Sequence, residues 1–197
     1  MELELFVSGI GGQGVQLLGK TLALAALREG RHVMLSGEFG GHMRGGSSVV
    51  TVVVGPEPIR ALPKLPSAGT AIALSHSYWE KVGPRLRPGS LILAEETVAD
   101  DLPDDGHRIV RVPAITLGTE AGNRLSSAMA MTGAFSELTG AVGIQALIDA
   151  MTEQLPSYRR QHAETNAKAI RLGAAFVRGQ GAALSYPAPY LAREAAE

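Results

Sequence analysis

The chain has 197 residues, a formal net charge of -1, 19% charged residues and no cysteine. This length suits one α/β domain with its own core. The near-neutral charge argues against a general nucleic-acid-binding protein, and the lack of cysteine excludes disulfides, thiolate zinc sites and iron–sulfur clusters ligated by this chain. No apolar run reaches the about 20 residues that a membrane helix needs, and no signal peptide precedes the first predicted strand, so we expect a cytoplasmic protein.

The N-terminal segment predicts a strand, a glycine turn and a helix. Residues 3–7 alternate like a strand, residues 8–14 read Ser-Gly-Ile-Gly-Gly-Gln-Gly, and residues 15–27 place apolar side chains at helical spacing. Glycine suits a sharp reversal with positive φ and close backbone packing. A helix that begins at such a turn presents unpaired N–H groups and the positive end of its dipole, which makes an anion site possible.

Two nucleotide-binding motifs overlap in this turn. Gly9, Gly11 and Gly14 match the dinucleotide fingerprint G-x-G-x-x-G at the position that the fingerprint requires. Its ribose-binding acid would be Glu38, which lies about two residues beyond the usual spacing of roughly 20. A stand-alone NAD(P)-binding dehydrogenase is therefore one alternative, and a turn that serves packing alone is another.

The second motif is a P-loop, because residues 14–21 fit G-x-x-x-x-G-K-[ST]. Glu95 and Glu96 at the end of an apolar run could imitate the acidic strand end of an ATPase. The segment 15–18 is apolar and helix-like, however, whereas a P-loop must wrap its backbone around phosphates. A P-loop ATPase is thus a third alternative, and we interpret the match as coincidence.

A second strand at residues 32–36 leads into a glycine-rich segment from Ser36 to Ser48, which we expect to be a long, pliable loop. Glu38 and Arg44 are its only fully charged residues. They either pair across the loop or line a site beside the glycine turn. A long loop at this place indicates function more strongly than a buried residue would.

The remaining elements predict an α/β fold. Strands are expected at residues 49–54, 70–74, 90–94 and 107–112, and the first of these, dense in valine, should be buried on both faces. Short helical turns at 76–82 and helices at 115–122, 125–135, 143–151 and 158–177 complete the pattern. We predict a single Rossmann-like three-layer domain over 1–179, with a mainly parallel sheet and a helical C-terminal part, followed by an extended arm, 180–197, that lies on a partner chain.

Three landmarks occur in order along the chain. They are the run from Gly9 to Val15, the pattern Glu38-x5-Arg44-Gly45-Gly46-Ser47 before the valine strand, and Met129-x-Met131-x-Gly133-Ala134 in the late helices. With Asn166-Ala167-Lys168-Ala169 and Gly173, they resemble the γ subunit or γ domain of the 2-oxoacid:ferredoxin (acceptor) oxidoreductases, of the pyruvate, 2-oxoglutarate, indolepyruvate and phenylglyoxylate type. The resemblance reaches to about Gly179. Thr70 and Ala128 stand where the family often has Asp and Asn.

The resemblance implies one subunit of a multi-subunit enzyme. That enzyme decarboxylates a 2-oxoacid on thiamine diphosphate, passes electrons through Fe–S clusters to ferredoxin or another acceptor, and usually releases an acyl-CoA. Sister subunits would hold the thiamine diphosphate, Mg²⁺ and clusters, because this chain has neither cysteine nor a Gly-Asp-Gly pattern. No catalytic residue, metal ligand, nucleic-acid partner or membrane partner is expected here, and the chain alone should be inactive.

We expect the glycine turn and the glycine-rich loop to meet at the strand ends. There they would form the rim of the thiamine diphosphate/CoA site across a subunit boundary, with Arg44 supplying positive charge for a phosphate or carboxylate. The expected cofactor-facing residues are Gly9, Gly11, Gly12, Gln13, Gly14, Glu38, Arg44, Gly45, Gly46 and Ser47.

Overall fold

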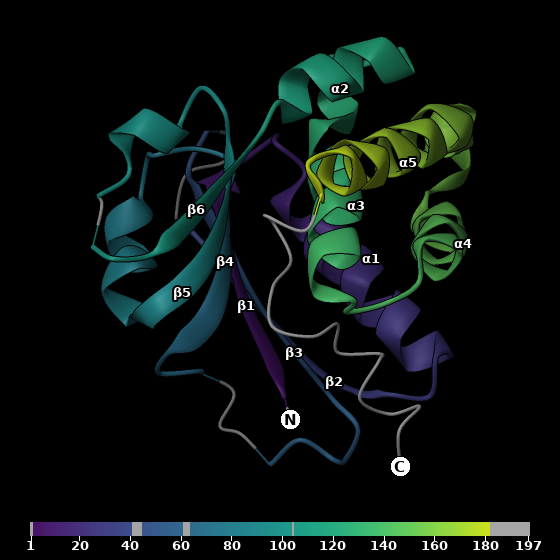
Figure 1. Ribbon diagram of the computed structural model, residues 1–197. Helices are drawn as coiled ribbons and strands as arrows, with labels where there is room; N and C mark the ends of the chain where they lie inside the picture. The colour runs from purple at the N-terminus through teal and green to yellow at the C-terminus, as the bar shows by residue number, and fades with distance from the viewer. Residues whose placement is uncertain (1, 41–44, 61–63, 104, 182–197) are drawn as a thin grey trace.

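The computed structural model describes residues 2–40, 45–60, 64–103 and 105–181, and all structural statements below concern these ranges. Six strands form one sheet, and the α-helices pack together on one of its faces (Figure 1). The strands are β1 (Leu3–Ile10), β2 (His32–Phe39), β3 (Ser47–Gly55), β4 (Ala68–Ala73), β5 (Leu86–Glu95) and β6 (Arg108–Val112). The α-helices are α1 (Val15–Arg28), α2 (Ala114–Ala121), α3 (Ser127–Thr139), α4 (Ile144–Gln154) and α5 (Ala163–Gly179).

Short 3-10 helices complete the described part of the fold. They are η1 (Trp79–Lys81), η2 (Gly83–Arg85), η3 (Ala99–Asp101), η4 (Arg124–Ser126) and η5 (Ser157–His162). The first three lie across the sheet from the α-helices, with the connections around them (Figure 1). The expected third layer is therefore present, but 3-10 turns and loops form it instead of α-helices.

The sheet has the order β2-β3-β1-β4-β5-β6. β1, β4, β5 and β6 pair in parallel, whereas β3 runs antiparallel to both β1 and β2. The α/β class and the mainly parallel sheet are thus confirmed, since β3 alone of the six strands runs against the others. A dinucleotide-binding sheet places its second strand beside the first. Here the β2–β3 hairpin inserts β3 between them.

The predicted loop from Ser36 to Ser48 is shorter than expected. β2 continues to Phe39, so that Gly37 and Glu38 pair with Val50 and Val49 of β3. The prediction was wrong here because the glycines signalled irregular backbone, whereas each residue of β2 has a register partner in the antiparallel strand β3. Strand pairing outweighs the low intrinsic strand preference of glycine.

Both faces of the sheet are buried, as expected for the valine-rich strand. Leu5 and Val7 of β1 face the α-helices, and Phe6 between them faces η1 and η2. Every residue of β3 is buried. This alternation follows from the two-residue repeat of a strand and fixes the register of β1 in the centre of the sheet.

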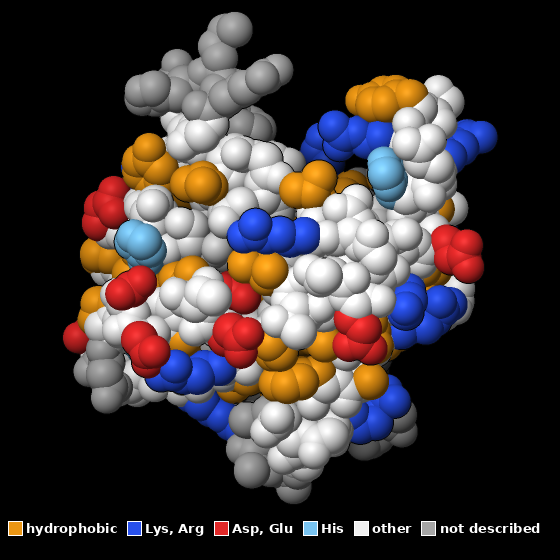
Figure 2. All heavy atoms as spheres, turned by 90° about the horizontal axis from the view of Figure 1, so that it is seen from above, with side chains coloured by type: hydrophobic (Ala, Val, Ile, Leu, Met, Phe, Trp, Pro, Cys, Tyr) orange, Lys and Arg blue, Asp and Glu red, His pale blue; other side chains and the backbone are white. Residues whose placement is uncertain are grey.

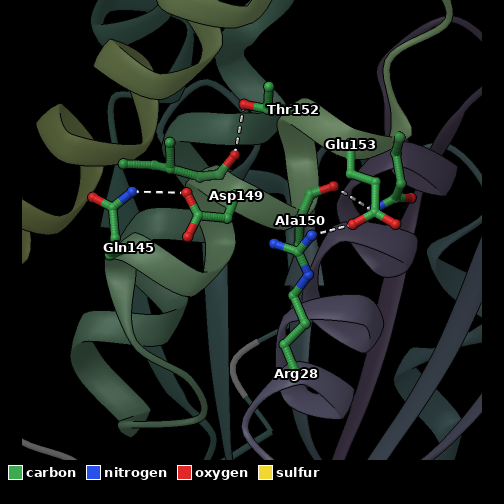
Figure 3. A network of polar contacts seen from close by, with 8 residues as sticks. Arg28, Gln145, Asp149, Ala150, Thr152 and Glu153 are labelled. Carbon is green, nitrogen blue, oxygen red and sulfur yellow. Dashed lines mark hydrogen bonds and ion pairs between the residues drawn. The ribbon is translucent and has the colours of Figure 1, made fainter.

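α1 lies very close to the sheet because it carries a glycine where it crosses β3. A Cβ atom at Gly19 would lie 2.4 Å from Cγ1 of Val50. The other side of α1 packs on α4, where Arg28 and Glu153 form an ion pair between the two helices (Figure 3). On the exposed side of α4, the amide of Gln145 donates to Asp149 Oδ1 at 2.8 Å.

Candidate functional site

The carboxyl ends of the parallel strands meet at one edge of the sheet, and a cavity of about 680 Å³ opens there. Open α/β sheets commonly bind ligands at this edge. Figure 2 looks down on it and shows hydrophobic side chains beside Lys, Arg and His side chains. The described residues that line the cavity are Ile10, Gly11, Gly12, Gly14, Val15, Gln16, Leu17, Gly40, Gly45, Gly46, Ser47, Ser48, Asn123, Leu125, Ser126, Leu155, Arg159, His162 and Asn166.

The glycine turn forms the floor of the cavity, and Gln13 holds it in shape. The Gln13 side chain accepts a hydrogen bond from the Ile10 N–H at 2.9 Å and donates one to the Leu74 carbonyl at 3.0 Å. It therefore fastens the turn after β1 to the end of β4. Both ends of its amide are used inside the protein, so Gln13 is a structural residue of the turn.

The N-terminus of α1 is open toward the cavity. Gly14 precedes the helix with φ +84°, a left-handed conformation that favours glycine, and no side chain caps the first turn. Val15, Gln16 and Leu17 line the cavity, and the backbone N–H groups of a first helical turn have no partner within the helix. These groups and the positive end of the helix dipole favour a negatively charged ligand.

The two glycine-rich segments meet, which confirms that part of the prediction. The Gly11 N–H donates to the Gly46 carbonyl at 2.9 Å, and the Gln16 amide donates to the Ser48 hydroxyl at 3.1 Å. The hairpin therefore closes over the turn from the β3 side. These contacts also occupy the Gly11 N–H, so the N–H groups left for a ligand lie at Gly12 and in α1.

The predicted site residues divide into four groups. Gly11, Gly12, Gly14, Gly45, Gly46 and Ser47 line the cavity, and Gln13 lines a smaller neighbouring one. Gly9 is buried behind the turn, where a Cβ atom would lie 2.7 Å from Cγ2 of Val15. Glu38 lies outside the cavity, with Oε1 3.9 Å from Nη1 of Arg85. Arg44 falls outside the described residues.

The opposite wall of the cavity comes from residues that the sequence did not single out for binding. Asn123 directly precedes η4, Arg159 and His162 lie in η5, and Asn166 lies in α5. Asn166 is only 7% exposed, and its Oδ1 accepts from the Ser126 hydroxyl at 2.7 Å. Its place on the buried face of the last helix was the available signal, since a polar residue on an apolar helix face needs a partner.

The rim of the cavity is apolar and basic. Leu125 is 74% exposed and Tyr158 is 71% exposed, beside Arg124 and Arg159 respectively. The Arg159 guanidinium lies 5.6 Å from the centroid of the Tyr158 ring. Large exposed side chains of this kind around a cavity are typical of a surface that another molecule covers.

The geometry favours neither stand-alone nucleotide enzyme. Glu38 is two strands away from the glycine turn, a separation of about 10 Å, because β3 lies between β2 and β1. Gly19, Lys20 and Thr21 belong to the second turn of α1, and Lys20 points away from the core as an exposed residue. No phosphate-wrapping loop precedes Lys20, because the helix already begins at Val15.

The described residues contain no group of three or more His, Cys, Asp or Glu side chains that could hold a metal ion. Among them there is also no helix long and apolar enough to cross a membrane.

Comparisons with known proteins agree with one another. The family model described as pyruvate ferredoxin/flavodoxin oxidoreductase matches residues 4–176. The 2-oxoglutarate synthase subunit KorC of Methanothermobacter marburgensis is 32% identical over 164 residues, which cover 79% of this chain and 88% of KorC. The ketoisovalerate oxidoreductase subunit VorA of the same organism is 31% identical over 137 residues, but the match spans 70% of this chain and only 28% of VorA.

Two solved structures share the fold. The gamma subunit of a keto/oxoacid ferredoxin oxidoreductase from Geobacter sulfurreducens superposes with a TM-score of 0.74 at 24% identity, over 90% of this chain and 99% of that one. A 2-oxoglutarate:ferredoxin oxidoreductase from Magnetococcus marinus gives a TM-score of 0.79 at 22% identity, over 90% of this chain and 31% of that one. The chain therefore belongs to the pyruvate ferredoxin/flavodoxin oxidoreductase family, as a gamma-type subunit.

Proposed function

We propose that this gamma-type subunit assembles with sister subunits that carry thiamine diphosphate, Mg²⁺ and iron–sulfur clusters, and that its cavity forms the rim of the thiamine diphosphate/CoA site and contacts the diphosphate of one of these ligands. The assembled enzyme would oxidatively decarboxylate a 2-oxoacid, usually to an acyl-CoA, and deliver the electrons to ferredoxin or another acceptor. The observation that carries the proposal is the open N-terminus of α1 at a cavity whose described lining residues include no Asp or Glu.

The residues of this chain do not fit an iron–sulfur cluster. The sequence has no cysteine, and the part of the chain that the structure describes offers no cluster of metal-ligating side chains. We therefore propose that the sister subunits bind the clusters and the metal. Thiamine diphosphate, when bound there, supplies the decarboxylation chemistry, and this chain would contribute binding and orientation.

The residues do fit a diphosphate. The cavity volume of about 680 Å³ lies in the range of small-molecule sites. The N–H groups of the first turn of α1 face it from one wall, and the buried Asn166 lines the other, with its Oδ1 already accepting from Ser126. The Asn166 amide nitrogen is then available to donate. Arg159 adds a cationic side chain and His162 an imidazole that can hydrogen-bond, and none of the described lining residues is Asp or Glu.

The named relatives act on different 2-oxoacids, since KorC is named for 2-oxoglutarate, VorA for ketoisovalerate, and a common gamma subunit of Pyrococcus abyssi for both pyruvate and ketoisovalerate. A subunit type shared by such enzymes fits a role at the diphosphate end of the site. Choice of the 2-oxoacid would then reside in the thiamine-binding subunits. We also propose a cytoplasmic location for the complex.

Arg159→Ala in the assembled enzyme tests this role. Loss of the guanidinium should raise the dissociation constant of CoA or thiamine diphosphate about three- to tenfold, because a charged hydrogen bond in a partly exposed site contributes roughly 1 kcal/mol. Arg160→Ala is the matched control, since Arg160 is its exposed neighbour and does not line the cavity. Unchanged affinity for both ligands, measured by calorimetry, would reject the proposal.

Two parts of the proposal concern residues that lie wholly or mostly outside the described ranges. We propose that Arg44 also supplies positive charge to the rim, and that the arm 180–197 lies on a sister subunit. Arg44→Ala should raise the Michaelis constant for CoA without altering assembly. Removal of 182–197 should weaken co-purification of the sister subunits. Unchanged turnover and CoA Michaelis constant in the first variant, or unchanged co-purification in the second, would remove that part.

A further inference from the structure

A second cavity, of about 200 Å³, adjoins the first at the carboxyl end of β5. The two cavities share Gly12 and Leu125, so they are continuous along the strand ends. The smaller one is enclosed by the apolar side chains of Leu74 and Ile115 and contains one acidic residue, Glu95. Its remaining lining residues are Gln13, Arg124 and Ser127.

Glu95 is the last residue of β5 and is only 2% exposed. Its Oε2 accepts hydrogen bonds from the Thr97 N–H at 2.8 Å and from the Thr97 hydroxyl. Its Oε1 is buried and has no partner among the described residues. An unsatisfied buried carboxyl oxygen costs about 1–3 kcal/mol, so a position of this kind calls for a donor that the described residues do not provide.

None of the described residues around Glu95 donates a hydrogen bond to Oε1. Both ends of the Gln13 amide are engaged with the backbone of Ile10 and Leu74. Arg124 lies in the same lining, but Oε1 has no bond to it. Glu95 lines this small, largely apolar cavity, which is continuous with the proposed diphosphate site.

We propose that Glu95 Oε1 accepts a hydrogen bond from the amino group of an aromatic heterocycle whose diphosphate occupies the larger cavity. The inference rests on the proposed function and extends it to the other end of the ligand. Apolar walls at Leu74, Ile115 and Leu125 suit the faces of a flat ring, and Glu95 suits its exocyclic amine. CoA carries such an amine on adenine, and thiamine diphosphate carries one on its pyrimidine.

Glu95→Gln provides a sharp test because the Thr97 N–H selects the orientation of the new amide. The amide oxygen must take the place of Oε2 to accept from Thr97, and the NH₂ group then replaces Oε1. The substitution thus exchanges an acceptor for a donor without changing the shape of the side chain. Glu96→Gln is the matched control, since Glu96 is the exposed neighbour and the charge change is the same.

The assembled enzyme is titrated by calorimetry with four ligands: CoA, CoA with hypoxanthine in place of adenine, thiamine diphosphate, and oxythiamine diphosphate. The two analogues carry a carbonyl where the natural ligand carries the amine. The wild-type enzyme and Glu96→Gln should bind one of the two analogues about tenfold more weakly than its parent, and Glu95→Gln should reverse that preference. The ligand and analogue whose order of affinity reverses show which ligand donates its amine to Glu95.

Equal affinity for parent and analogue in both pairs, together with no effect of Glu95→Gln, would overturn the inference. If Arg159→Ala still weakens binding in that case, the diphosphate site survives and only the amine contact fails. If Glu95→Gln instead removes the sister subunits, as seen by native mass spectrometry, while the folded chain melts normally, a basic side chain of a sister subunit is the donor and the inference is also wrong.

Discussion

The crossing of α3 and α5 depends on two glycines, and Gly173→Ala should break it. A Cβ atom at Gly173 would lie 1.8 Å from the Ala130 carbonyl oxygen, and one at Gly133 would lie 2.0 Å from that of Ile170. The two helices therefore touch backbone to backbone, each through a glycine. α5 also presents Asn166 to the cavity, so a shift of α5 would move a wall of the site.

The cost of Gly173→Ala follows from the overlap. The shortest ordinary contact of a Cβ atom is 3.4 Å, so the new methyl group is about 1.6 Å too close to a backbone oxygen that no rotamer change can move. Overpacking of a core costs about 1–3 kcal/mol, and the rigid partner places this case at the upper end. Alanine returns about 0.5–1 kcal/mol of helix propensity, which leaves a net loss of about 2 kcal/mol.

Thermal unfolding of the full chain measures this loss. In a domain of this size about 1 kcal/mol shifts Tm by roughly 2–4 °C, so Gly173→Ala should lower Tm by about 4–8 °C. Gly179→Ala is the matched control, because Gly179 lies in the same helix and a Cβ atom there would meet nothing within 4 Å. Equal melting temperatures for the two variants would refute the proposed backbone contact.

Three further predictions concern the turn, α1 and the β6 edge. Gln13→Ala should lower the free energy of unfolding by about 1–3 kcal/mol and speed hydrogen exchange of the Ile10 amide, and unchanged exchange would contradict its role as a clamp. Lys20→Ala should leave turnover and ligand affinity unchanged, since Lys20 is exposed on the second turn of α1. An ATPase activity of the chain that this substitution abolishes would instead support the P-loop ATPase. The hydrogen bond from Arg111 holds the pKa of the Asp100 carboxyl below its ordinary 3.8. At pH values above 3.8 this exposed pair therefore makes a small contribution to the stability of the fold, and the contribution is lost as the pH falls through the lowered pKa. NMR titration should show the Asp100 pKa rising in Arg111→Ala, and an unmoved value would contradict the pairing.

The parts of the fold that could be predicted from the sequence are those set by local pattern. The helical spacing of apolar residues begins directly after Gly14, and α1 indeed begins at Val15. The valines of β3 indicate burial on both faces because they interrupt any alternation, and every residue of β3 is buried. Such signals survive because the side-chain period decides them without reference to distant residues.

The position of Glu38 could not be predicted in the same way. Its pairing with Val49 depends on the register of a hairpin and on the insertion of β3 beside β1, neither of which leaves a local pattern. The glycines of the segment favoured a loop, and a loop would have carried Glu38 toward the turn. The strand instead directs it to Arg85, outside the cavity.

The far wall of the cavity could not be predicted from the sequence either, because it forms only when α5 docks on α3. Arg159 and Asn166 are distant in sequence from the glycine turn, and only the close approach at Gly133 and Gly173 brings the start of α5 above it. Glu95 and Glu96 are adjacent in the sequence, and no local sequence pattern shows which of the two is buried. The direction of the side chain at the end of β5 makes one buried and the other exposed.

The central claim is that this chain completes a site whose cofactors are held by other subunits. Affinity purification of the tagged chain from its own cells, followed by native mass spectrometry and a 2-oxoacid oxidation assay, tests it most directly. The account predicts a hetero-oligomer that contains thiamine diphosphate and iron–sulfur clusters, and no turnover by the separated chain. A lone chain that retains a tightly bound nucleotide and turns over substrate would contradict it.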